Sequence, residues 1–381
     1  MKLSLIRVLN GKSILTVFNS FIFISLINSS YGLAKSESLW AGYPKALQKS
    51  DFNVRRNPFL PFLNSKNQVF SIEEPTPELC RQKISEVICV VNPAKKGEDV
   101  DARPCLNSSN EQTTLVYAQV FEQLFDHYPW SLQKLFCSVQ RIFIEKVSFG
   151  TAYAKGLTDP NGNFNGAIIG IRQSVLDEKL SLSAWASWKE QLSFGGVKNS
   201  YQLTPGLPTV YTSTPNKQIN DLLYFVISHE LGHVFDFAHK LNKVENCSVT
   251  KDPDEYPVCD FVPGSWGAIS WKNNQQPKDI NDFPLRKSLC FYDCERPMSK
   301  NDINTLYSDL WKTTYISTYA ATNPYDDFAD SFAYYLMSDR LEFCYIIDTN
   351  QGMFFDPLYK LSGVTFSEKY NYIKKFLSEL D

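Results

Sequence analysis

The spacing of apolar residues changes along this chain, and the change predicts which segments are helices and which are strands. Apolar residues three and four apart, as in residues 219–227, follow one face of an α-helix. Short apolar runs that follow Gly- or Asn-rich turns, as in residues 166–172, are typical of strands. The pattern predicts helices at residues 115–125, at residues 129–137 and around Trp185, Trp188 and Leu192, and strands at residues 141–147 and 166–172.

The strongest helical stretch follows a Pro/Thr-rich loop at residues 204–215. Its apolar positions are Ile219, Leu222, Leu223, Val226 and Ile227. Thr214 and Pro215 before it predict an N-cap and a first-turn proline. When the apolar stripe is extended past residue 227 by the same spacing, it reaches His229 and His233. We therefore expect both imidazoles at the edge of a buried helix face.

The distribution of prolines and polar residues divides the chain into three parts. Residues 1–34 are predicted to be a leader peptide. Residues 35–110 are rich in proline and polar residues and are predicted to be an extended N-terminal segment. Residues 111–381 are strongly periodic and predict one folded domain. Within it, residues 244–300 interrupt the helical pattern and predict a cysteine-bearing insertion.

The leader peptide is indicated by basic residues followed by an apolar run at residues 14–27. The run is shorter than the ~20 residues needed to span a bilayer and fits the apolar core of a secretory signal. Small residues before position 35 place the expected cleavage after Ala34. No later segment is apolar for long enough to cross a membrane. We therefore expect a secreted or periplasmic protein with no membrane span after signal removal.

Composition excludes one class of partner. Removal of residues 1–34 takes away three positive charges and changes the formal net charge from -3 to about -6. The chain contains no stripe rich in Lys or Arg. These features predict no nucleic-acid partner.

All nine cysteines lie beyond the leader peptide, and exported proteins with many cysteines form disulfides. Local spacing favours Cys247–Cys259 and Cys290–Cys294. The other five cysteines leave several pairings open, and the odd total leaves at least one free thiol. Their positions are Cys80, Cys89, Cys105, Cys137 and Cys344.

Three of the four histidines lie between residues 229 and 239, and His229, Glu230 and His233 form the motif H-E-x-x-H. Because a helix turns every ~3.6 residues, side chains at i and i+4 share one face and two imidazoles can bind one cation. The glutamate beside the first histidine lies close enough to take a proton from metal-bound water. This is the signature of zinc hydrolases.

A catalytic zinc has three protein ligands and an open fourth position. His239 is one candidate for the third ligand, since it completes the outer histidine spacing of the metzincins. That family has Gly where this chain has Asp236, so that the backbone can turn. If the helix continues instead, His239 is rotated by roughly 240° from His233 and points away from the metal.

A second candidate lies downstream, in residues 318–333. Asn323 as N-cap and Pro324 in the first turn predict a helix. Asp326 and Asp330 are four residues apart and therefore share one face of it. The segment also fits a purely structural interpretation, because an acid three residues after an Asn N-cap is typical of a helix start.

These two motifs resemble the gluzincins, and in particular the catalytic domain of anthrax lethal factor and its relatives. There, a similar Tyr-x6-Glu-x-Phe-Ala stretch follows H-E-x-G-H. The resemblance covers about the last half of the chain. It implies that His229, His233 and Asp326 bind Zn²⁺, that Glu230 is the general base, that Tyr319 donates a hydrogen bond in the transition state, and that Asp330 orients a ligating histidine.

The chain departs from these relatives at Asp326, where they have Glu. Aspartate is one methylene shorter, so the two helices would have to approach more closely for it to bind the metal. Asp327 and Asp330 are the fallback ligands.

The sequence thus predicts an α+β chain with a zincin-like metallopeptidase fold, in which a small mixed sheet covers the H-E-x-x-H helix and the C-terminal part is mostly helical. The predicted function is a zinc-dependent endopeptidase that acts on a protein or peptide substrate through water activated by Glu230. Residues 166–172 are a candidate edge for pairing with an extended substrate, although an inner strand fits equally well. The alternatives are a metzincin-like peptidase that uses His239 and a non-catalytic exported protein that binds zinc or a partner.

Overall fold

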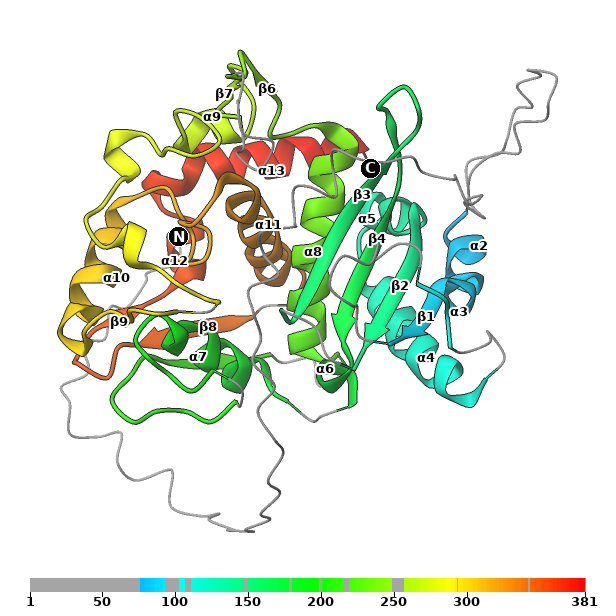
Figure 1. Cartoon of the computed structure of the whole chain (residues 1–381), viewed down its shortest axis with the longest axis horizontal. Helices are drawn as coiled ribbons and strands as arrows, with labels where there is room; N and C mark the ends of the chain where they lie inside the picture. Colours follow the sequence, from blue (N-terminus) through cyan, green and yellow to red (C-terminus); the bar gives the residue numbers. More distant parts are fainter. Residues whose placement is uncertain are drawn as a thin grey trace, which may run out of the picture. The chain divides into compact units, whose positions relative to one another are not determined.

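Helices and short strands are mixed along the chain in an α+β arrangement (Figure 1). The structure is a computed structural model that describes residues 76–92, 103–106, 111–146, 150–177, 180–198, 201–214, 219–248, 257–292, 294–341 and 343–380. The predicted leader peptide and its cleavage site lie outside these residues. In the part of the chain described, no helix is both long and apolar enough to cross a membrane.

The largest sheet has four strands in the order β1-β2-β4-β3. They are β1 (Ile88–Val91), β2 (Val139–Glu145), β3 (Ala152–Thr158) and β4 (Phe164–Arg172). β1, β2 and β4 run parallel, and β3 runs antiparallel to β4. Of the two alternatives for residues 166–172, an edge strand or an inner strand, the structure shows the inner strand, because β4 pairs with a neighbour on each side. A strand in this central position is buried on both faces, which explains its continuous apolar run.

The H-E-x-x-H motif lies on α8 (Asp221–His239), a long helix that is buried on nearly all sides. α8 packs against β3 and β4, and its other side contacts α11 (Pro324–Leu341). Figure 1 shows α8 between the strands of the sheet and α11. A helix with so little exposed surface must be apolar around most of its circumference, and α8 is. His229 is therefore buried and His233 half-buried, whereas His239 at the end of the helix is exposed.

α8 begins later than the sequence pattern predicts. Asn220 is its N-cap, and the Asn220 side chain accepts a hydrogen bond of 3.0 Å from the backbone N–H of Leu223. The predicted N-cap, Thr214, instead follows a strand, and Pro215 lies outside the described residues. The loop predicted at residues 204–215 thus contains β5 (Thr209–Ser213). β5 pairs with β8 (Cys344–Asp348), which pairs with β9 (Phe354–Phe355).

The part of the N-terminal segment that is described folds against the following helices. It forms α2 (Pro77–Gln82), α3 (Ile84–Val87) and β1, and then come α4 (Gln112–His127) and α5 (Trp130–Phe136). A disulfide joins Cys80 to Cys137, and another joins Cys89 to Cys105. The segment expected to be extended therefore supplies two helices and one sheet strand between residues 76 and 92.

The cysteine-bearing region at residues 244–300 consists mainly of short elements. They are β6 (Val244–Glu245), β7 (Asp260–Phe261), α9 (Gly267–Ser270), η3 (Asp279–Asn281) and η4 (Arg286–Ser288). Both predicted disulfides, Cys247–Cys259 and Cys290–Cys294, are present, and Cys344 is the free cysteine. Trp266 and Trp271 are fully buried, so they belong to the core.

The other helices lie on both sides of α8 in the sequence, and the part after residue 300 is mostly helical, as predicted. They are α6 (Gln173–Asp177), α7 (Leu182–Leu192), η5 (Lys300–Asp302), α10 (Ile303–Lys312), α12 (Pro357–Leu361), η6 (Val364–Phe366) and α13 (Ser367–Leu380). α11 begins at Pro324, directly after Asn323. Asn323 Oδ1 accepts from the backbone N–H groups of Tyr325 and Asp326, so it caps the helix as predicted.

Candidate metal centre

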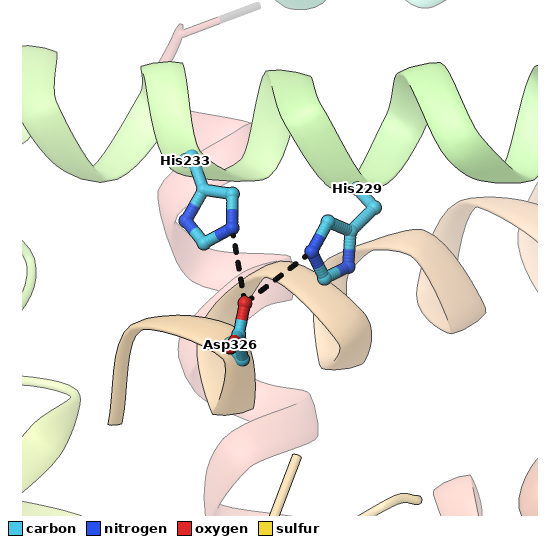
Figure 2. A group of neighbouring side chains, drawn as sticks. All are labelled: His229, His233 and Asp326. Carbon is cyan, nitrogen blue, oxygen red and sulfur yellow. Dashed lines mark ion pairs between the residues drawn. The ribbon is translucent and has the colours of Figure 1, made fainter. Parts of the chain in front are cut away.

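The two histidines of the motif and Asp326 meet where α8 contacts α11. His229 Nε2 lies 3.5 Å from Asp326 Oδ1, and His233 Nε2 lies 3.3 Å from the same oxygen. Figure 2 shows both imidazoles projecting from one face of α8 toward the carboxylate on α11. One donor atom from each residue falls within 4.8 Å of the other two. The i and i+4 spacing and the helix start at Asn323 together bring three atoms that could hold a metal ion into one group.

Glycine in the motif allows the two helices to approach closely. A Cβ atom built on Gly232 would lie only 2.9 Å from the Cα atom of Ala329 on α11. No side chain other than hydrogen fits there unless a backbone moves. The close approach provides a physical reason why Asp326 reaches both imidazoles with one methylene less than a glutamate.

Asp330 holds the second nitrogen of His229. Asp330 Oδ1 lies 2.7 Å from His229 Nδ1, and Asp330 Oδ2 accepts a hydrogen bond from the Ser317 hydroxyl. Ser317 Oγ in turn accepts from the backbone N–H of Ala320 at 2.9 Å. These contacts fix the ring orientation of His229 and leave its Nε2 directed at the group of donor atoms. This is the arrangement in which outer carboxylates orient metal-binding histidines.

Asn323 orients the other side of the Asp326 carboxylate. The Asn323 amide donates to Asp326 Oδ2 at 2.5 Å, while Asp326 Oδ1 faces the two histidines. The residue that caps α11 therefore also positions the carboxylate. Asp326 can therefore be both an acid at the start of α11 and a metal ligand.

Charge is distributed unevenly in this group when no metal is bound. Burial lowers the pKa of His229, but its bonds to Asp326 and Asp330 outweigh burial and raise that pKa to about 10. Burial raises the pKa of Asp326, but the hydrogen bonds from His229 and His233 outweigh it, so the pKa falls below its ordinary value. Without metal, His229 is therefore protonated at neutral pH and pairs with the Asp326 carboxylate. A divalent cation has to displace the proton on Nε2 of His229.

Glu230 is buried beside these residues, and one of its two carboxylate oxygens, Oε2, has no hydrogen-bond partner in the described part of the chain. Its side chain is 5% exposed. Burial raises the pKa of Glu230, and the nearby His229 and His233 partly oppose this increase. A buried oxygen without a partner costs about 1–3 kcal/mol. A bound cation and its water would satisfy this oxygen, and the donor set of two imidazoles and one carboxylate is one that catalytic zinc uses.

The ring of Tyr319 lies next to that of His229, with the two centroids 5.8 Å apart. Its hydroxyl is 3.1 Å from the hydroxyl of Tyr292, and the Lys189 ammonium lies 3.5 Å from the centroid of its ring. Burial raises the pKa of Tyr319 well above the ordinary value, so the phenol remains protonated at neutral pH. The site therefore includes a tyrosine that can donate a hydrogen bond, with its ring next to His229.

The other sequence candidates lie outside the group of donor atoms. α8 continues to His239, whose ring contacts Phe235 and Phe376 at centroid distances of 4.6 and 6.4 Å. Asp236, at the position where metzincins have Gly, accepts two hydrogen bonds of 2.8 Å from Asn242 after the end of the helix.

The fallback ligand Asp327, one residue after Asp326, is turned by about 100° around α11 and contacts other residues. It is fully buried, forms an ion pair with Lys369 and accepts a hydrogen bond of 3.0 Å from the indole N–H of Trp271. These contacts connect α11 to α13 and to residues 244–300. Its carboxylate is therefore part of the structural core and not of the group around His229.

The comparisons with known proteins give one match. Residues 296–380 match a family model described as "Putative zinc-binding metallo-peptidase". The match supports a zinc metallopeptidase. It includes Tyr319, Asp326 and Asp330 but begins after α8, so it is independent of the H-E-x-x-H motif. Neither the curated proteins nor the solved structures include one that matches this chain.

Proposed function

We propose that this chain is a zinc-dependent endopeptidase of the gluzincin type with a zincin-like fold, similar to the catalytic domain of anthrax lethal factor and its relatives. The observation that carries the proposal is the group of His229, His233 and Asp326 donor atoms. Beside it lies Glu230, whose buried Oε2 has no hydrogen-bond partner among the residues that the structure describes. The match to a zinc-binding metallopeptidase family on a different part of the chain supports the same activity.

In this proposal, His229, His233 and Asp326 hold the zinc ion. Bound zinc supplies a Lewis acid and lowers the pKa of a coordinated water to about 7. Glu230 accepts a proton from the attacking water and passes it to the leaving amine. Tyr319 donates its hydroxyl hydrogen to the oxygen of the scissile carbonyl as negative charge develops there. Asp330 keeps Nε2 of His229 directed at the ion.

We also propose that the protein acts on protein or peptide substrates outside the cytoplasm, in a secreted or periplasmic location. The apolar run after Lys2, Arg7 and Lys12 has the length of a secretory signal. Four disulfides among the described cysteines are consistent with an oxidising compartment.

Zinc dependence tests the proposal. We expect the purified protein to cleave an unfolded protein substrate, to lose this activity when a chelator removes the metal, and to recover it with about one equivalent of Zn²⁺ per chain. Mass spectrometry of the products measures internal peptide-bond cleavage. Cleavage that is insensitive to the chelator would exclude a zinc peptidase, whereas stoichiometric zinc without cleavage would favour the non-catalytic alternative.

A further inference from the structure

Tyr292 contacts the proposed oxyanion donor but belongs to neither sequence motif. It lies between Cys290 and Cys294, which form a disulfide, and its hydroxyl is 3.1 Å from that of Tyr319. Burial raises the pKa of Tyr292, so this phenol keeps its proton at neutral pH. Two hydroxyls thus lie in contact, and one of them belongs to Tyr319, whose ring is next to that of His229.

The disulfide loop that carries Tyr292 is attached to α7. The hydroxyl of Ser193, at the C-terminal end of α7, donates to the carbonyl oxygen of Cys290 at 2.8 Å and accepts from its N–H at 3.0 Å. The carbonyl of Ser193 accepts from the N–H of Met298 at 2.8 Å. Backbone on both sides of the disulfide is therefore bound to one buried serine, and this limits the movement of Tyr292.

α7 also restrains the ring of Tyr319. Lys189, one turn before Ser193, places its ammonium over the face of the Tyr319 ring, 3.5 Å from its centroid. Phe291 meets the same ring edge-on at a centroid distance of 5.0 Å. Because Lys189 and the loop fix the ring, its hydroxyl has a defined position, and Tyr292 is the neighbour that contacts that hydroxyl.

We propose that Tyr292 is a positioning residue for the peptidase reaction, and that it acts through Tyr319. This inference rests on the proposed function. When the Tyr292 hydroxyl donates to the oxygen of Tyr319, the hydrogen of Tyr319 is free to point at the substrate carbonyl. The two hydrogen bonds, from Tyr292 to Tyr319 and from Tyr319 to the substrate, then strengthen each other as negative charge develops on the carbonyl oxygen. The Cys290–Cys294 disulfide holds this arrangement by fixing the loop.

A double-mutant cycle tests this role. Tyr292→Phe should lower kcat about tenfold, which corresponds to the loss of one hydrogen bond, with KM and zinc content unchanged. Tyr319→Phe should lower kcat further. In the Tyr319→Phe background, Tyr292→Phe should have no additional effect, because the residue through which it acts is already changed. Tyr117→Phe, which removes a buried hydroxyl bonded to Asp177 at 3.0 Å, is the control for general stability effects.

Removal of the disulfide provides a second variant. The double substitution of Cys290 and Cys294 by Ser should reproduce the loss of kcat with zinc retained, whereas the same change at Cys247 and Cys259 should leave kcat unaltered. Full kcat in Tyr292→Phe, or equal losses of kcat in both Tyr319 backgrounds, would overturn the positioning role while the parent remains active. A parent protein without zinc-dependent cleavage would instead refute the proposed function and this inference with it.

Discussion

Replacement of Glu230 by Gln is expected to lower kcat by about 10²–10⁴-fold while the zinc content stays at one per chain. The amide has nearly the same shape as the carboxylate but cannot accept the proton of the attacking water. His229 and His233, which flank Glu230 on α8, keep their positions, so the metal remains bound. Metal analysis and steady-state kinetics on the same preparation measure both quantities.

Glu145→Gln is the matched control. Glu145 is also a buried glutamate, but it lies on β2 and its carboxylate already bonds to Arg103 and Tyr153. We expect this variant to lose stability and to retain kcat. If Glu230→Gln turned over substrate at nearly the parental rate, Glu230 would not be the general base.

Replacement of Asp326 by Ala is expected to weaken zinc affinity by more than about 100-fold, because changes of outer residues alone cost 10–100-fold. His239→Ala should leave zinc affinity nearly unchanged, since His239 packs on Phe235 and Phe376. The metzincin-like alternative predicts the opposite result for the two variants. Competition with a chromophoric chelator measures both affinities.

Helix stability has to be separated from metal binding in this comparison. Asp326 lies in the first turn of α11 and receives a hydrogen bond from the capping Asn323, so its removal also destabilises the helix start. The affinities therefore have to be measured at a temperature where circular dichroism shows that both variants are folded. Zinc bound tightly by Asp326→Ala, together with its loss in His239→Ala, would reverse the ligand assignment.

Asp326→Glu separates the chemistry of the ligand from its length. We expect it to retain zinc with lower affinity than the parent, because the Gly232–Ala329 contact sets the helix spacing for the shorter side chain.

Local sequence patterns carry much of the information about the group of donor atoms. The i and i+4 spacing places His229 and His233 on one face of a helix, and Asn323 with Pro324 marks the start of the second helix. Asp326 and Asp330 share a face of that helix because they are one turn apart. Each of these relationships depends on a few adjacent turns of helix, so periodicity and capping are sufficient to predict it. The contact of Asp330 with His229 joins two helices, and only the resemblance to the gluzincins predicts it.

The surroundings of the site depend on packing that local patterns do not contain. Lys189, Tyr292 and Ser317 reach the site from separate segments, and no motif marks them. The close approach of Gly232 to Ala329 likewise becomes visible only when the two helices are placed together.

The order of the strands in the sheet also depends on contacts between segments that are far apart in the sequence. An apolar run such as that of β4 is compatible with an edge or a central position until its neighbours are known. Thr214 and Pro215 resemble a helix start and predict too early a beginning for α8, whereas the actual cap is Asn220.

The most direct test of the central claim is a diffraction experiment on the zinc-reconstituted protein at the zinc absorption edge. We predict one anomalous peak per chain, about 2.0–2.2 Å from a ring nitrogen of His229, a ring nitrogen of His233 and a carboxylate oxygen of Asp326. A chain without a peak between α8 and α11, or with an ion bound by His239 in place of Asp326, would contradict the account.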